Sequence, residues 1–466
     1  MPDSPDRAVP TDQQPRSDAG RTAPGEPATN LARRHDREIL RLAVPALGAL
    51  TAEPIYVLVD TAIVGHLGTH SLGGLGVAGT VLTTVFGVFN FLAYGTTAAV
   101  ARRIGAGDRK AAVEQGLAGV WLAVGLGAVL TGLGLLFAGP IVDAMGASAD
   151  VRPYALTYLR ISLLGAPMVT VMLAGVGYLR GVQDGRTPFV IAVAANVANL
   201  ALEVLFVYGF GWGISGSAWG TVLAQTASAI AYVVIAERHR RAHHARRRPD
   251  HREIIRTARV GSHLVVRTAS LLAAFTVTTA IASRISDTAI AAHQVAFQLW
   301  YFLALALDAI AIAGQSIVGR YLGADDAPGA RSVTRRMLQL GTLAGIVAAL
   351  VVVAGRGPLA ALFTDDRGVR SAVEAVLPIV ALWQPIGAIV FVLDGILIGA
   401  GETRYLAIAM VAATFAFLPA AALVVSAEAG LVALWWALGV FLVARLIGMY
   451  ARYRGDDWLV TGATRT

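Results

Sequence analysis

The sequence "ARRIGAGD" at residues 101–108 returns in the second half of the chain as "GRYLGADD" at residues 319–326. Three further pairs keep the offset that separates positions 101 and 319: "VDTAI" at 59–63 with "VTTAI" at 277–281, "AP" at 166–167 with "QP" at 384–385, and "RGVQDGR" at 180–186 with "IGAGETR" at 398–404. Several independent matches at one offset, the repeat offset, indicate an internal duplication. The chain therefore consists of two related halves.

The composition is that of a membrane protein. Of the 466 residues 56% are hydrophobic and only 15% are charged, whereas a soluble domain is roughly a quarter charged. Runs of about 20 apolar residues, the length that a helix needs to cross a bilayer, follow one another along the chain. The runs are continuously apolar and do not alternate, which favours helices over a barrel. We expect an all-α polytopic protein with twelve spans, near residues 39–65, 72–101, 112–138, 154–179, 187–209, 214–236, 260–284, 288–318, 334–355, 371–399, 403–425 and 429–450.

Positive charge orients these spans. Arginine and lysine gather in the even-numbered connections, above all in "RHRRAHHARRRPDHR" at 238–252, and the connection after the ninth span is the one exception. The positive-inside rule then predicts a multi-pass protein of the cell (plasma) membrane with both termini in the cytoplasm. The predicted parts are a disordered cytoplasmic tail (1–36), an N-terminal six-helix lobe (37–237), a basic cytoplasmic linker (238–256), a C-terminal six-helix lobe (257–452) and a cytoplasmic tail (453–466). Both lobes share one orientation, which predicts a pseudo-two-fold axis along the membrane normal and a central cavity.

Several function classes are disfavoured by the sequence. It contains no cysteine, no Gly-Lys-Ser/Thr phosphate loop, no Gly-x-Ser-x-Gly and no His-Glu-x-x-His. We therefore expect no enzyme, no cofactor and no metal, and a protein driven by a proton or sodium gradient. We also expect a monomer. The net charge of +8 is explained by contact of the cytoplasmic face with anionic lipids, and not by nucleic acid. The linker histidines resemble a metal-binding tract in composition only, and we interpret the linker as a solvated loop: His239, His243, His244 and His251.

Four motifs in this order resemble the multidrug and toxic compound extrusion (MATE) family, DinF-like branch, from about residue 37 to 452. They are "VDTAIVGHLGTHSLGGLGVAG" (59–79), "GAGD" (105–108), "NLALEVLFVYGFGWGISGSA" (199–218) and "LDAIAIAGQSIVGRYLGADD" (307–326). The resemblance implies a secondary active exporter of small amphipathic or cationic compounds, working by proton or sodium antiport through alternating access of two lobes. Two alternatives remain: a major facilitator antiporter, whose loop motif is only partly matched by "GAGDRKAAVEQ" (105–115), and a lipid or cell-envelope precursor flippase.

Acidic residues inside the spans are the candidates for ion coupling, because a charge in the bilayer is costly and usually functional. Glu53 and Asp60 lie two helical turns apart and are expected on nearly the same face. Asn196, Asn199 and Glu203 share a face of the fifth span. At the repeat offset, the counterparts of Asp60, Asn199 and Glu203 are Thr278, Phe417 and Ala421, so the acids belong to one lobe. The resemblance assigns Asp60, Asn199 and Glu203 to a proton or cation site, with Glu203 in place of the commoner aspartate.

The remaining candidates concern movement and the second lobe. Pro45 and Pro54 each remove a helix hydrogen bond from the first span and are hinge candidates, with the ionisation of Asp60 changing the bend. In the C-terminal lobe we expect a structural ion pair between Arg267 and Asp308, and Asp394 is the candidate to contact a cationic substrate. Polar and aromatic candidates to line the cavity are Gln294, Gln298, Gln384, Trp300, Tyr301 and Trp383.

Overall fold

The computed structural model describes residues 28–248 and 251–464, and these residues are almost entirely helical. The helices are α1 (Ala28–Gly65), α2 (Thr69–Phe89), α3 (Phe91–Gly105), α4 (Arg109–Ala144), α5 (Arg152–Leu164), α6 (Ala166–Gly181), α7 (Arg186–Val204), the π-helix η1 (Leu205–Gly209), α8 (Ile214–Ala242), α9 (His251–Ile285), α10 (Asp287–Gly323), α11 (Ala327–Ala354), α12 (Arg356–Phe363), α13 (Arg367–Gly399), α14 (Thr403–Ser426) and α15 (Gly430–Arg454).

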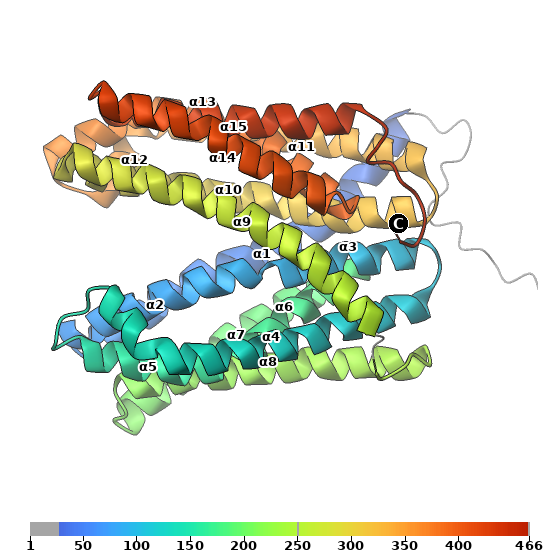
Figure 1. Cartoon of the computed structure of the whole chain (residues 1–466), viewed down its shortest axis with the longest axis horizontal. Coiled ribbons are helices and arrows are strands. Elements are labelled where there is room, and N and C mark those ends of the chain that lie inside the picture. Colours follow the sequence, from blue (N-terminus) through green and yellow to red (C-terminus); the bar gives the residue numbers. More distant parts are fainter. Residues whose placement is uncertain (1–27, 249–250, 465–466) are drawn as a thin grey trace, which may run out of the picture.

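The twelve predicted spans are confirmed within the described ranges. Eleven are apolar helices long enough to cross a membrane, counting α2 with α3 and α7 with η1 as one span each. The twelfth is the pair α5 and α6, which is bent by 50°. Helices α1–α8 form the N-terminal lobe and α9–α15 the C-terminal lobe (Figure 1). The largest buried apolar cluster lies mainly in the C-terminal lobe, and smaller clusters fill the N-terminal lobe.

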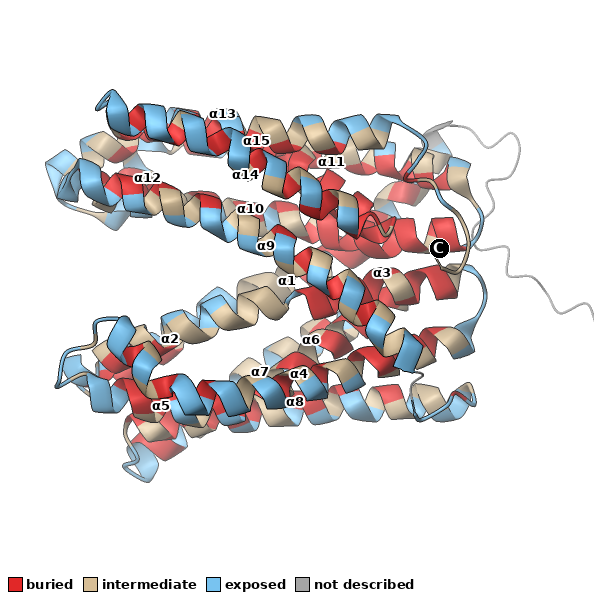
Figure 2. Ribbon diagram, viewed as in Figure 1, coloured by how far each residue is buried: buried red, intermediate tan, exposed pale blue. Residues whose placement is uncertain are grey.

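The end of the bundle that carries Arg102, Arg103 and Arg336 is called the arginine-rich end. Here the first helix of each lobe crosses to the other lobe. Near the start of α1, Asp36 accepts two hydrogen bonds from Arg336 of α11, at 2.6 and 2.8 Å. Near the start of α9, Glu253 accepts a hydrogen bond from Arg103 of α3 at 2.9 Å. Because these pairs join opposite lobes, they hold the lobes together at this end, where buried residues are dense (Figure 2).

The duplicated motif lies where the two lobes touch. Gly105 at the end of α3 packs against the backbone of Arg320 in α10, and Gly323 at the end of α10 packs against the backbone of Arg102 in α3. A Cβ atom at either glycine would collide with the facing carbonyl oxygen. Since residues 102 and 105 are the repeat partners of 320 and 323, the two contacts are equivalent and identify the pseudo-two-fold axis.

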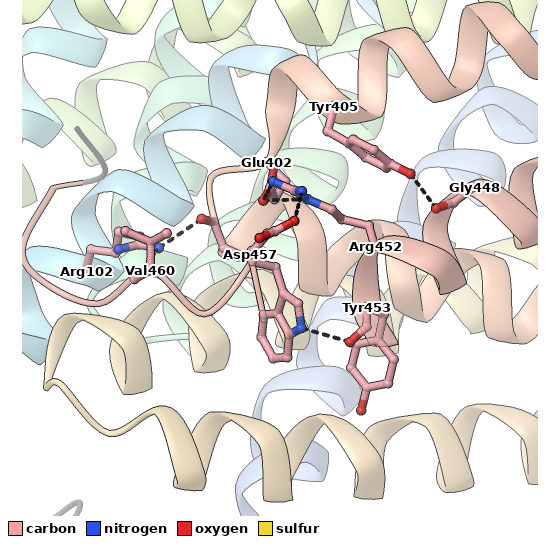
Figure 3. Close-up of polar contacts among 10 residues, drawn as sticks. Arg102, Glu402, Tyr405, Gly448, Arg452, Tyr453, Asp457 and Val460 are labelled. Atoms are coloured by element: carbon pink, nitrogen blue, oxygen red, sulfur yellow. Dashed lines mark hydrogen bonds and ion pairs between the residues drawn. The ribbon is translucent and has the colours of Figure 1, made fainter. Parts of the chain in front are cut away.

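The segment after α15 packs across this junction (Figure 3). Arg102, which is buried, donates to the carbonyl oxygens of Ala400 at 2.8 Å, Val460 at 3.0 Å and Gly462 at 3.1 Å. Trp458 of this segment is fully buried and its indole nitrogen donates to the Tyr453 carbonyl oxygen at 2.9 Å. One arginine of the N-terminal lobe is thereby bound by two separate parts of the C-terminal half.

The helices extend into three segments that were predicted as tails or linker. The predicted tail 1–36 is helical from Ala28 onward, because Asp36 and Glu38 bind arginines of the other lobe, and residues 1–27 lie outside the described residues. The predicted tail 453–466 is packed against the lobes as far as it is described. In the predicted linker 238–256, α8 continues to Ala242 and α9 begins at His251. The predicted lobe boundaries remain predictions.

The glycine contacts predict a specific sensitivity. Gly323→Ala is expected to force α3 and α10 apart and to lower the melting temperature of the purified protein, because the new methyl group meets backbone that cannot move aside. The matched control is Gly125→Ala in α4, where a Cβ atom has open space. Equal melting temperatures for the two variants would contradict the packing described.

The ion pair of Asp36 predicts a pH dependence. Hydrogen bonding to the Arg336 guanidinium holds the pKa of Asp36 below its usual range. Because the folded value is lower than the unfolded one, the pair stabilises the protein above about pH 4 and this stabilisation is lost as the pH falls through the folded value. Asp36→Asn should cost up to about 1 kcal/mol at pH 7, and the difference in melting temperature from the unsubstituted protein should shrink under acidic conditions. A difference that grows on acidification would refute this.

Candidate functional site

A buried polar cluster centres on Asp60 in the interior of the N-terminal lobe. The Asp60 side chain is 5% exposed. Its Oδ1 accepts a hydrogen bond from the Ser217 hydroxyl of α8 at 2.6 Å, and its Oδ2 a longer one from the Tyr158 hydroxyl of α5 at 3.4 Å. Three helices therefore position this one carboxylate.

A second chain of hydrogen bonds runs beside it. Asn199 of α7 donates through Nδ2 to the Thr221 hydroxyl at 3.2 Å, and Thr221 donates to the Ser217 carbonyl oxygen at 3.1 Å. The Tyr56 hydroxyl lies 2.9 Å from the same Thr221 oxygen. Tyr56 is one turn before Asp60 on α1, so this helix is joined to α8 at two successive turns.

Glu203 completes the cluster and is the least satisfied group in it. It is fully buried, and neither of its oxygens makes a well-directed hydrogen bond to a described residue. Its carboxyl group nevertheless lies next to that of Asp60. The Oδ1 atom of Asn199 is also buried without a partner among the described residues. The unpartnered atoms here are thus all hydrogen-bond acceptors.

Local backbone structure explains how Glu203 reaches this position. The α-helix α7 ends at Val204 and continues as the π-helix η1, a rare form that is common at functional sites. Across the interface, Gly220 of α8 lies against Glu203, and a Cβ atom there would approach its side chain and backbone to about 3.1 Å. A small residue on one helix and a widened turn on the other therefore make room for the carboxyl group.

This arrangement suits a small cation. Two adjacent buried carboxyl groups repel each other if both are charged, and a proton or a cation between them removes the repulsion. In the described part of the chain, no group of three or more acidic, histidine or cysteine residues comes together that would hold a metal ion. The cluster offers at most two negative charges with hydroxyl and amide oxygens, which fits a proton or a monovalent cation.

The structure brings together part of the predicted set. Asp60, Asn199 and Glu203 lie in one polar cluster, and their role in ion coupling stays a prediction. Asn196 does not join them, because its Nδ2 donates instead to the Ala52 carbonyl oxygen of α1 at 2.9 Å.

Glu53 and Asp60, which were expected on nearly the same helix face, lie in different environments. Glu53 is exposed and lies near Tyr301 of α10, whereas Asp60 is buried in the N-terminal lobe. The reason is that α1 crosses between lobes, so one face of the helix meets different neighbours along its length. Pro45 and Pro54 are both inside α1, and Pro45 lines a pocket between α1, α6, α7 and α10.

Four residues of the cluster were missed by the sequence analysis: Tyr56, Tyr158, Ser217 and Thr221. A signal existed for two of them. Ser217 and Thr221 are four residues apart in an apolar span and hence lie on one helix face. The two tyrosines carry no such signal, because a tyrosine in a span is equally expected at the membrane interface.

The predicted pair of Arg267 and Asp308 is a wrong prediction. Arg267 of α9 instead forms a bidentate ion pair with Asp394 of α13, and both side chains are buried. Asp308 is half-buried and lies within electrostatic range of Arg267 and of Arg180 from the other lobe. Asp394 is therefore already bound, which removes it as a contact for a cationic substrate.

The other candidates to line the central cavity differ in exposure and location. Gln294, Gln298 and Tyr301 are exposed, whereas Gln384 is buried and donates to the Val380 carbonyl oxygen at 3.4 Å. Trp300 and Trp383 line a pocket inside the C-terminal lobe.

Comparisons with known proteins agree with an internal duplication of the chain. The family model described as MatE matches residues 45–205 and again residues 264–423. Protein DETOXIFICATION 44, chloroplastic, of Arabidopsis thaliana is 33% identical over 426 residues, which cover 88% of this chain and 80% of that protein. DNA damage-inducible protein F of Escherichia coli (strain K12) is 28% identical over 439 residues, covering 90% and 92%. A solved structure described as the outward-facing conformation of a multidrug resistance MATE family transporter has a TM-score of 0.82 at 21% identity, covering 93% of this chain and all of that one.

The observed ion pair of Arg267 with Asp394 can be tested against the predicted pair of Arg267 with Asp308. Asp394→Asn should destabilise the protein by about 3–5 kcal/mol, because it leaves Arg267 as a buried unpaired charge. The matched control Asp308→Asn should have a much smaller effect. Melting temperatures of the two variants in detergent decide the point, and a larger loss for Asp308→Asn would restore the original pairing.

Proposed function

The chain belongs to the MATE family, whose members are membrane transporters and not enzymes, and from this premise we propose that it is a secondary active exporter. It moves small amphipathic, cationic compounds out of the cell in exchange for protons or sodium ions. The observation that carries the proposal is that the carboxyl groups of Asp60 and Glu203 are buried next to each other. Both Glu203 oxygens and the Asn199 Oδ1 atom lack a hydrogen-bond partner among the described residues, and a cation would satisfy these three acceptors. The repeat-related positions in the other lobe are Thr278, Phe417 and Ala421, which are buried and not acidic.

The lobes are held together at the arginine-rich end, which we propose to be the cytoplasmic end in the cell membrane, with both termini on that side. In this outward-open form the carboxyl pair binds its cation from the outside. Loading neutralises the repulsion between Asp60 and Glu203 and favours closure of the lobe around them. Return to the inward-open form then requires separation of the contacts that Arg102 and the two crossing helices make.

Helix α1 is the proposed link between the cation and the lobes. Its outer part is joined to α8 through Asp60 and Tyr56, and its inner part is joined to the other lobe through Asp36. Pro54 lies between these attachments and removes one backbone hydrogen bond from the helix. A change in the charge of Asp60 therefore alters the contact between α1 and α8 on one side of Pro54. The missing backbone hydrogen bonds at Pro54 and Pro45 allow α1 to change its bend in response.

The proposed substrate contacts lie between the lobes. Glu53 of α1 and Asp308 of α10 are both within electrostatic range of Tyr301. Two acids and an aromatic face are the groups that attract an organic cation. We propose these three, with the exposed Gln294 and Gln298, as contacts for a cationic substrate. The arginines of the inner face are proposed to rest on anionic lipid, and the transporter to act as a monomer.

The proposal is tested by efflux from proteoliposomes. With ethidium as the probe, an imposed pH or sodium gradient should drive export by the unsubstituted protein, and each pH unit can support about a tenfold substrate gradient per exchanged proton. Asp60→Asn should abolish gradient-driven export while leaving the protein folded. The matched control is Asp143→Asn, which removes an acid whose ion pair with Arg152 is exposed, and it should export normally.

The two gradients are applied separately, so the same experiment assigns the coupling ion. Export that continues in Asp60→Asn under both gradients would remove the proposed role of the carboxyl pair. Failure of the unsubstituted protein to export under either gradient would refute ion antiport itself.

A further inference from the structure

The C-terminal lobe contains a pocket whose lining includes the repeat counterpart of one residue of the N-terminal polar cluster. Its lining includes Phe275, Trp300, Trp383, Trp435, Phe441 and Arg445. At the repeat offset, Trp435 is the counterpart of Ser217, the hydroxyl that binds Asp60, and Gly439 is the counterpart of Thr221. At this position the hydroxyl that binds Asp60 in one lobe is therefore replaced by an indole in the other.

Arg445 supplies the only formal charge among the residues that line this pocket within the described chain. Its side chain is 1% exposed, and its Nε and Nη2 atoms are buried with no hydrogen-bond partner among the described residues. A guanidinium does not lose its proton in proteins, so the charge persists. No described carboxylate forms an ion pair with it, and the neighbouring Arg267 is already neutralised by Asp394. The guanidinium carbon instead lies 5.5 Å from the centre of the Phe441 ring.

Two indoles add further donors to the same pocket. The Nε1 atoms of Trp383 and Trp435 are both buried and unpartnered within the described chain. Trp383 reaches the pocket because Gly439 has no side chain, and a Cβ atom there would collide with the indole ring. The unpartnered polar atoms of this pocket are thus all donors, from three residues on two helices, whereas those of the N-terminal cluster are all acceptors.

We propose that this pocket binds one compact monovalent anion, a halide or the carboxylate group of a small organic acid. The Arg445 guanidinium and the indole N–H groups of Trp383 and Trp435 hold the anion, and the aromatic walls exclude water. A buried, unpaired cation is strongly unfavourable, and an anion is the ligand that satisfies both the charge and the donors. The aromatic residues alone would suit an organic cation, but the charge of Arg445 repels one.

The test uses the purified full-length protein in detergent, with the melting temperature and the tryptophan fluorescence as signals. Sodium isethionate is replaced by sodium chloride at constant ionic strength, and in a separate series by sodium benzoate. We expect a saturable rise in melting temperature with chloride, benzoate or both, and the responding series identifies the source of the anion. Asp60→Asn should respond like the unsubstituted protein, so the result is independent of the proposed export.

Substitutions within the pocket separate binding from general salt effects. Arg445→Met should lose the response and, in isethionate, should be at least as stable as the unsubstituted protein, because a buried unpaired charge is removed. Trp435→Phe should weaken the apparent affinity about tenfold, since it removes one donor to a charged ligand. The matched control Trp121→Phe, at an exposed tryptophan of the N-terminal lobe, should leave the affinity unchanged.

Three results would overturn the proposal. One is the absence of a saturable response in both anion series. Another is a response that persists unchanged in Arg445→Met. The third is destabilisation of Arg445→Met to the same extent in isethionate as in chloride, because the arginine would then stabilise the lobe without any bound anion.

Discussion

The close approach of α3 and α10 at Gly105 and Gly323 is the contact on which the rest of the arrangement depends. Each glycine lies against the backbone of the other repeat, and no side chain fits there. The two equivalent contacts fix the axis that relates the lobes and join them at the arginine-rich end. The hydrogen bonds of Arg102 and the crossing of α1 and α9 reinforce this junction. The interiors of the lobes, away from the junction, are left free to differ.

The lobes do differ, and in opposite electrical senses. Among the described residues, the N-terminal cluster buries carboxyl and amide oxygens that lack donors, whereas the C-terminal pocket buries guanidinium and indole groups that lack acceptors. A protein interior rarely leaves such groups unpaired, because each costs free energy. This grouping of unpaired atoms of one kind is the basis of both proposals, a proton or cation beside Asp60 and an anion beside Arg445. Substitution after the duplication has thus given the two lobes buried polar groups of opposite charge.

The sequence predicted the features that depend on spacing along one chain. The constant repeat offset indicated the two lobes, the apolar runs indicated twelve spans, and the spacing of Asn199 and Glu203 placed them on one face. Features that depend on how helices cross could not be predicted from the sequence. Glu53 is separated from Asp60 because α1 leaves one lobe for the other, and Arg267 pairs with Asp394 because α13, and not α10, presents its acid in reach. The isolation of Arg445 was equally hidden, since only packing reveals that no described carboxylate pairs with it.

The central claim is that the carboxyl pair of the N-terminal lobe holds the coupling cation and releases it in exchange for substrate. Infrared difference spectroscopy of the purified protein, with and without a cationic dye, measures this directly through the carboxyl stretching bands. The account predicts a substrate-induced change in these bands that disappears in both Asp60→Asn and Glu203→Gln. An identical difference spectrum in the unsubstituted protein and in both variants would contradict it.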